Sequence, residues 1–412
     1  MKHLRLFTVF FLLGLGLTAR AQTPVFDCVV AQDGTGHYAN LQDAIDAAPA
    51  HSRNPYTIFV KRGRYHEHVF IPEDKSCLRI IGQGRDVVRI FDDRVSGGRN
   101  ASPVDVAATV VCHAPDVYFE GITFENSWGT RMKDGPQALA LYTKNDRIVV
   151  NRCAMLSYQD TYRTAEVVNG RNYVRDCFIE GAVDFIYGQG NVYFDSCTLN
   201  IVRKEGGFIV ATKHEEGTRW GYVFRNATIT APGHAADTQI WLGRPWLHKP
   251  MAVFIDTRAE VTIPPEGWYD HMSTLPKVYA DYGTTDGNGR PLDLSRRISR
   301  YYKVEGTDTI WGDCKSRLTD AEAATYTIDN VLDGDDGWQP RQLCMALLAP
   351  RVTVKGRTLV WAPVRGARGY VVEHQGRVVA VTADCRFSLP ADTTGYCVRT
   401  VSPNGSLSMN DK

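Results

Sequence analysis

Five short segments of this chain can be laid over one another, and this repetition constrains the fold more than any other feature. Each segment opens with two mostly apolar positions, continues with a mostly polar pair and has a small or apolar residue fifth. The segments are Tyr118–Phe124, Val149–Met155, Tyr173–Ile179, Tyr193–Leu199 and Val223–Ile229. Successive segments start 31, 24, 20 and 30 residues apart. An irregular period in this range, with many strands and few helices, predicts a parallel β-solenoid.

An antiparallel β-sandwich is the alternative fold. It would need hairpin turns, and the Asn-Gly and Asp-Gly pairs that favour such turns are mostly missing here. Helical periodicity is scarce from about residue 27 to 265. The one good helix candidate is Leu41–Ala48, which has apolar residues at 41, 44, 45 and 48 and is followed by Pro49. Its position near the N-terminus suits a cap on the end of the solenoid.

Three cysteines occupy the fifth position of the repeat: Cys153, Cys177 and Cys197. Equivalent residues on successive coils would lie about 4.8 Å apart. Their parallel side-chain directions disfavour a disulfide, so we expect a ladder of small buried thiols. No His or second Cys pair stands at the spacing of a zinc site.

Two aspartates share one register of the repeat. Asp160 follows Cys153 by seven residues, and Asp184 follows Cys177 by seven. Two carboxylates on neighbouring coils cannot both ionise easily, so one should hold a proton near neutral pH. Gln137 precedes Gln159 by 22 residues, about one coil, so two amides that could stabilise an oxyanion would lie nearby. From these residues alone, a catalytic pair and an internal polar ladder are equally good interpretations.

The residues around these positions resemble the pectin methylesterases (pectinesterases). The resemblance runs from about residue 29 to 340 and rests on an ordered set of short motifs. They are Asp33–Pro49, Gly63–Val69, Gly135–Leu141, Tyr158–Thr161, Asp184–Gly188, Leu242–Trp246 and Leu318–Pro340. The resemblance implies an all-β fold, a right-handed parallel β-helix. It also implies hydrolysis of galacturonate methyl esters in pectin (methyl-esterified homogalacturonan), without a metal or other cofactor.

The resemblance also implies roles for individual residues. Asp184 would be the nucleophile and Asp160 the general acid and then base. Gln137 and Gln159 would form the oxyanion hole. Arg244 would hydrogen-bond Asp184 and keep it ionised, because a guanidinium lowers the pKa of its partner.

Five aromatic residues are the expected sugar-binding side chains, since aromatic rings stack on sugar faces. Four of them flank the motifs, and the fifth, Trp268, matches a Trp of the family pattern. They are Trp246, Phe185, Tyr162, Tyr187 and Trp268. Two of them depart from the family pattern, which usually has Phe where Tyr187 stands and often Leu where Tyr162 stands. The cations Arg163, Lys213 and Arg219 could meet the carboxylates of demethylated sugar units, although solvated surface charge is the simpler interpretation of each.

Both ends of the chain differ in character from the repeat. Residues 1–21 combine a basic start, an apolar run from Leu6 to Leu17 and small residues at Ala19 and Ala21, as in a secretory signal peptide. We therefore expect the protein to be periplasmic or extracellular. We expect its β-helix domain to span residues 22–344. Residues 345–412 read as closely spaced strands and resemble a fibronectin type III domain, a small β-sandwich. Two disulfides are possible in that compartment, Cys314–Cys344 and Cys385–Cys397.

Composition limits the partners. The 412 residues carry a formal net charge of +1, which argues against a nucleic-acid binder. No internal stretch reaches the roughly 20 apolar residues of a membrane span, and we expect a monomer. Among rival functions, a polygalacturonase would need Gly-His-Gly and Arg-Ile-Lys triplets, which this sequence does not contain. A lyase would need a calcium-binding acid cluster, and a β-helix that only binds carbohydrate would lack one of Asp160, Asp184 or Arg244.

Overall fold

The computed structural model of the chain describes residues 24–96, 102–390 and 394–409. The expected signal peptide, residues 1–21, lies outside the described residues. Within them, no helix is long and apolar enough to cross a membrane.

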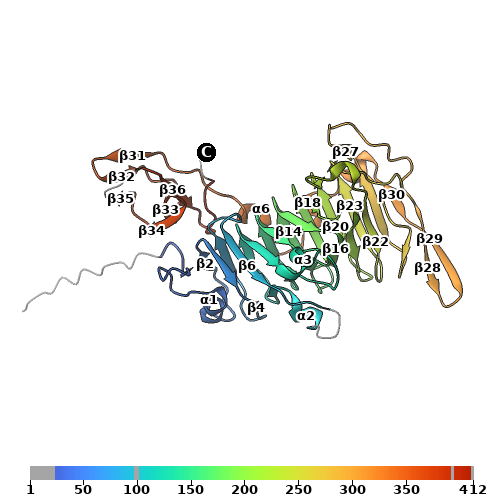
Figure 1. Ribbon diagram of the computed structural model, residues 1–412, viewed down its shortest axis with the longest axis horizontal. Coiled ribbons are helices and arrows are strands. Elements are labelled where there is room, and N and C mark those ends of the chain that lie inside the picture. The colour runs from blue at the N-terminus through green and yellow to red at the C-terminus, as the bar shows by residue number, and fades with distance from the viewer. Residues whose placement is uncertain (1–23, 97–101, 391–393, 410–412) are drawn as a thin grey trace, which may run out of the picture.

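Three long parallel sheets run the length of the coil and confirm the predicted right-handed parallel β-helix (Figure 1). Sheet A consists of β1 Cys28–Val30, β2 Tyr56–Val60, β5 Leu78–Gly82, β8 Tyr118–Glu120, β11 Ile148–Asn151, β14 Arg171–Arg175, β17 Asn191–Asp195, β20 Tyr222–Arg225, β23 Met251–Ile255, β26 Val278–Tyr282 and β30 Lys315–Arg317. Sheet B consists of β3 Gly63–His66, β6 Val88–Asp92, β9 Thr123–Asn126, β12 Ala154–Leu156, β15 Phe178–Gly181, β18 Thr198–Ile201, β21 Thr228–Thr230, β24 Arg258–Ala259 and β27 Thr285–Asp286. Sheet C consists of β4 Val69–Ile71, β7 Val110–Cys112, β10 Leu141–Thr143, β13 Tyr162–Thr164, β16 Val183–Gly188, β19 Gly207–Thr212 and β22 Ile240–Pro245.

Short elements complete the β-helix. The predicted N-terminal helix is present as α1 Leu41–Ala47, which is capped by the Asn40 side chain and buries Leu41, Ala44 and Ile45. The other helices are α2 Val104–Ala107, α3 Ser127–Met132, the 3₁₀ turn η1 Ala235–Asp237, α4 Asp320–Ala323, α5 Ile328–Val331 and α6 Pro340–Leu343. A three-stranded sheet of β25 His271–Met272, β28 Arg300–Glu305 and β29 Asp308–Asp313 extends the far end.

The five repeated segments lie in the register that the sequence predicts. Tyr118 pairs with Val149, Val149 with Tyr173, and Tyr173 with Tyr193. Each segment is two strands and not one, because the chain turns at its fourth residue as it passes from sheet A to sheet B. The backbone is left-handed there, with φ of 66° at Gly121, 52° at Arg152 and 50° at Asp176. The repeat therefore marks a corner of the coil.

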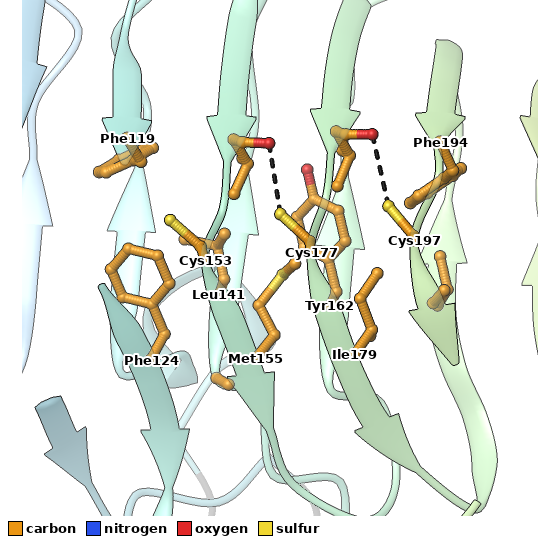
Figure 2. Packing of buried hydrophobic residues seen from close by; sticks show 14 of the residues in the cluster. Phe119, Phe124, Leu141, Cys153, Met155, Tyr162, Cys177, Ile179, Phe194 and Cys197 are labelled. Carbon is orange, nitrogen blue, oxygen red and sulfur yellow. Dashed lines mark hydrogen bonds between the residues drawn. The ribbon is translucent and has the colours of Figure 1, made fainter. Parts of the chain in front are cut away.

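The inside of the coil is filled by side chains that stack from one rung to the next. Phe194, Phe224 and Phe254 form a continuous stack with ring centroids 4.3 Å apart. The predicted thiol ladder is present at the corner between sheets A and B, where Cys153, Cys177 and Cys197 are buried (Figure 2). The Cys177 thiol donates to the Val150 carbonyl at 3.3 Å, and Cys197 donates to Val174 at 3.4 Å.

The outer face of sheet A is apolar and is covered by the C-terminal part of the chain. Its outward residues, such as Tyr118, Val149 and Tyr173, form one buried cluster with Leu332 of the segment after α5 and with residues of the tail. Burying this second face stabilises the fold, since each buried large apolar side chain contributes about 1.5–3 kcal/mol. The C-terminal region therefore packs along the β-helix.

The tail folds as two small antiparallel sheets packed face to face. One contains β31 Val352–Lys355, β32 Thr358–Trp361 and β35 Arg386–Ser388, and the other contains β33 Gly369–His374, β34 Arg377–Thr382 and β36 Tyr396–Val401. Trp361 and Tyr370 meet edge to face at 5.3 Å in its core. This arrangement is the expected small β-sandwich, and its resemblance to fibronectin type III stays a prediction.

Neither of the two possible disulfides is formed. The Cys314 sulfur accepts a hydrogen bond from the backbone of Tyr279, whereas Cys344 packs in the cluster over sheet A. Cys385 is a free thiol beside the Tyr370 hydroxyl. The folding of both regions has placed each sulfur against a different neighbour.

Candidate active site

A cavity of about 170 Å³ opens on the outer side of sheet C. Its lining contains all five residues expected to carry the chemistry, which come from three different coils and from strand β22. The full lining is Gln137, Gln159, Asp160, Asp184, Tyr187, Ala211, Arg244, Trp246 and Met272. The fold therefore brings together residues that are up to 135 positions apart in the sequence.

The two aspartates stand in matching positions on neighbouring coils, as their spacing predicts. Gln159 pairs with Val183, and the Asp160 amide donates to the Val183 carbonyl at 3.2 Å. Both aspartates adopt left-handed backbone conformations, with φ of 61° at Asp160 and 48° at Asp184. Asp tolerates this region better than most residues, but the conformation is still costly, and such strain clusters at functional sites.

A register shift in β16 explains why Asp184 faces outward. The pairing of β16 with β19 shifts between Val183 and Ile186. Phe185 and Ile186 both point into the core, so the usual strand alternation is broken between them. The irregularity leaves Asp184 and Tyr187 together at the cavity, which is the re-aiming effect that bulges have near active sites.

Arg244 holds Asp184 from two strands away. Its Nε donates to Asp184 Oδ1 at 2.8 Å and its Nη2 donates to Oδ2 at 2.5 Å. The guanidinium also lies 4.4 Å from the centre of the Phe208 ring, on the intervening strand. The Arg244 carbonyl accepts a hydrogen bond from the buried Tyr279 hydroxyl at 2.8 Å. Both the side chain and the backbone of Arg244 are therefore fixed.

The two carboxyl groups differ in their electrostatic surroundings. Burial raises the pKa of Asp160 well above its usual range, and the negative charge of Asp184 raises it further. Burial also raises the pKa of Asp184, but the hydrogen bonds and charge of Arg244 oppose that rise. Asp184 is therefore the carboxyl that ionises first, and Asp160 is the one that keeps its proton.

Gln137 and Gln159 lie side by side on neighbouring coils at the edge of the cavity. The Ala138 amide donates to the Gln159 carbonyl at 3.1 Å, which ties their two backbones together. Both side chains are partly buried and line the same space as the two aspartates. This places two amide groups beside the carboxyl pair, as their spacing predicts.

Two of the five aromatic residues line the cavity. Trp246 and Tyr187 meet edge to face with centroids 5.7 Å apart, and Trp246 is only partly buried. The Tyr187 hydroxyl is buried and has no hydrogen-bond partner among the described residues. These two rings form one wall of the site.

The other three aromatic residues lie in the core, which corrects the expectation that they bind sugar. Tyr162, Phe185 and Trp268 are all completely buried. The Tyr162 hydroxyl lies 3.0 Å from Thr143 Oγ1, and Trp268 stacks on Tyr279 at 4.3 Å. A ring enclosed on all sides has no face on which a sugar could stack. These three residues are therefore part of the core of the β-helix.

Sequence reasoning missed Ala211 and Met272. Ala211 pairs with Tyr187 on one side and with Arg244 on the other, so the repeat register could have revealed it. Met272 belongs to β25, which lies outside the repeat and gave no comparable signal.

The expected cations are engaged in local contacts. Glu166 accepts from Arg163 at 2.5 Å and from Lys213 at 2.7 Å. Arg219 lies over the Trp220 ring at 5.5 Å. In the part of the chain that the structure describes, no group of three or more His, Cys, Asp or Glu side chains could hold a metal ion.

Comparison with known proteins agrees with this architecture. Over 322 residues the chain is 32% identical to a pectinesterase/pectinesterase inhibitor from Prunus persica, covering 75% of this chain and 57% of the relative. Over 320 residues it is 29% identical to pectinesterase/pectinesterase inhibitor 18 from Arabidopsis thaliana, covering 74% of this chain and 53% of the relative. The chain thus spans little more than half the length of these curated relatives.

Solved structures extend the same similarity to the fold. The structure of a pectin methylesterase from carrot superposes with a TM-score of 0.62 at 27% identity, covering 76% of this chain and 94% of that one. The family described as Pectinesterase matches residues 27–335, which include the whole cavity. On these grounds the chain belongs to the pectinesterase family.

Proposed function

We propose that this protein hydrolyses the methyl esters of galacturonate units in pectin, releasing methanol and leaving a carboxylate on the polymer. The observation that carries the proposal is the pair of aspartates in one cavity, of which only Asp184 is held by an arginine. A carboxylate nucleophile and a protonated acid at neutral pH are the two groups that ester cleavage through an acyl-enzyme needs.

In this mechanism the ionised Asp184 attacks the ester carbonyl and a tetrahedral intermediate forms. The amides of Gln137 and Gln159 donate hydrogen bonds to its oxyanion. Asp160 gives its proton to the departing methoxy oxygen, and methanol leaves behind an anhydride with Asp184. Asp160, now ionised, takes a proton from a water molecule that attacks this anhydride, which returns both aspartates to their starting states.

Substrate binding follows from the walls of the cavity. Trp246 is the partly exposed ring beside the aspartates and would stack on a sugar face, with Tyr187 supporting it. Lys213 lies 6.0 Å from the Trp246 ring centre, so a positive charge borders this subsite. We further propose a monomer that is exported by residues 1–21 to the periplasm or beyond.

The deciding experiment measures methanol release from highly methylated pectin by the intact protein and by Asp184→Asn and Asp160→Asn. We expect release from the intact protein, and a loss of several orders of magnitude in Asp184→Asn. No methanol from the intact protein on any pectin would reject the proposed function. Unchanged activity in Asp184→Asn would reject only the assignment of the nucleophile.

A further inference from the structure

A second cavity, of about 350 Å³, lies at the seam between the β-helix and the C-terminal region. Its lining comes from three distant parts of the chain: Arg79, Asp116, Arg147, Gly337, Trp338, Gln339, Gln342, Leu343 and Asn404. The β-helix residues lie in β5 or just before β8 and β11 of sheet A, whereas the catalytic cavity lies on sheet C. Its volume falls in the range of about 300–1,000 Å³ that ligand sites occupy.

The cavity carries one cation without a carboxylate partner. Arg147 is paired with Asp116, through Nε–Oδ1 at 2.5 Å and Nη2–Oδ2 at 2.7 Å. Among the described residues, Arg79 forms no ion pair: its Nη1 donates only to the carbonyls of Leu78 at 3.4 Å and Asp116 at 3.2 Å. Its Nε is buried and has no hydrogen-bond partner in the part of the chain that the structure describes. Arg79 is partly buried, and a guanidinium that has no carboxylate partner among the described residues favours an anionic ligand, whose carboxylate matches its geometry.

The remaining lining suits a sugar. Trp338 is partly buried, so part of its indole ring faces the cavity. Gln339, Gln342 and Asn404 add side-chain amides, of which Asn404 donates to the Gln342 carbonyl at 3.3 Å. An aromatic surface with several amides provides the stacking and the hydrogen bonds that sugar hydroxyls require.

We propose that this seam cavity binds a hexuronate unit, with the sugar carboxylate on Arg79 and one sugar face against Trp338. The proposal rests on the proposed function, since de-esterification is the reaction that turns neutral ester units into uronates. The site would retain the enzyme on polymer that it has already processed. Because Asn404 belongs to the tail, ligand binding would also tie the tail to the β-helix.

The test is calorimetric titration of the full chain with galacturonate, compared with neutral galactose and with acetate. The variants are Arg79→Gln and Trp338→Phe at the seam, with Trp246→Ala as the matched control in the catalytic cavity. We expect galacturonate binding to weaken at least tenfold in both seam variants and to persist in Trp246→Ala. Galactose and acetate should each bind at least tenfold more weakly than galacturonate.

Several outcomes would overturn the proposal. They are no galacturonate binding by the intact chain, binding lost in Trp246→Ala but kept in the seam variants, and acetate binding as tight as galacturonate. Thermal melting of Arg79→Gln, expected to be unchanged, shows that the variant is folded. Since the titration needs no turnover, a failure of the proposed esterase activity would be seen separately from a failure of the seam site.

Discussion

Arg244 binds Asp184 through two parallel hydrogen bonds, Nε–Oδ1 at 2.8 Å and Nη2–Oδ2 at 2.5 Å. Among the described residues, the neighbouring Asp160 has no arginine at hydrogen-bond distance. This asymmetry turns two carboxyls of equal chemistry and equal register into an ionised group and a protonated group.

Arg244→Gln should shift the acidic limb of the pH–activity profile to higher pH. The guanidinium lowers the pKa of Asp184, so its removal lets Asp184 keep its proton until a higher pH, by about 1–3 pH units. The profile of methanol release against pH measures the shift. Arg219→Gln, far from the cavity lining, is the matched control, and an acidic limb that stays in place in Arg244→Gln would contradict the assignment.

Arg163→Gln should shift the alkaline limb of the pH–activity profile to higher pH. The positive charge of Arg163 lowers the pKa of Asp160, so without it Asp160 stays protonated to a higher pH. Activity should therefore persist further into the alkaline range, while the acidic limb stays where it is. The same profile measures both limbs, and a shift of the acidic limb alone would show that Asp160 is not the proton donor.

Asp160→Asn should be more stable than the parent protein at neutral pH, and this difference should disappear in acid. The folded-state pKa of Asp160 is raised, so the stability contributed by its protonated form is present at low pH and is lost as pH rises through that pKa. The melting temperature of Asp160→Asn should exceed that of the parent at neutral pH, by about 1–2 °C per kcal/mol for a chain of this length, and converge with it in acid. Asp308→Asn, at an exposed position of β29, is the control variant. A lower melting temperature for Asp160→Asn at neutral pH would be the contrary result.

Gln137→Ala should lower kcat by about 100- to 1,000-fold with little change in KM. An oxyanion donor acts on charge that develops in the transition state, so its removal slows the chemical step and leaves ground-state binding nearly intact. Steady-state kinetics on methylated pectin separate the two constants. A change confined to KM would make Gln137 a binding residue.

Trp246→Ala should weaken substrate binding, whereas Phe185→Ala should lower the stability of the fold. Trp246 is partly exposed beside the aspartates, so we expect a KM about tenfold higher, equal to about 1.4 kcal/mol of lost binding. Phe185 is completely buried, so its loss should cost about 3–5 kcal/mol of folding stability. Kinetics and chemical denaturation of both variants test this contrast, and a raised KM in a fully stable Phe185→Ala would restore Phe185 as a sugar-binding residue.

The register of the β-helix could be predicted from the repeat alone. In a solenoid each coil contacts only its neighbours, so residues in equivalent repeat positions become spatial neighbours. This is why aligning Cys153 with Cys177 also aligned Asp160 with Asp184, and why Gln137 falls beside Gln159. The family resemblance then supplied Arg244, which no spacing argument had selected.

The direction in which a side chain points could not be predicted in the same way. Alternation along a strand would put Phe185 and Ile186 on opposite faces, but the register shift in β16 sends both into the core. Tyr162 is expected at the sugar site because it follows a motif, and Trp268 because it matches a Trp of the family, yet both are fully buried. Local irregularities of this kind depend on how neighbouring coils pack, which a single strand's pattern does not encode.

The chain's repeat and motifs thus specified the coil, its register and the identity of the paired carboxyls, because those depend on contacts between adjacent coils. Tertiary packing specified which aromatic rings reach the cavity and where the tail docks. The seam cavity depends on tertiary packing most of all, since it joins Arg79 to Asn404 across 325 positions. Contacts over such separations form only when the apolar outer face of sheet A is covered by the C-terminal region.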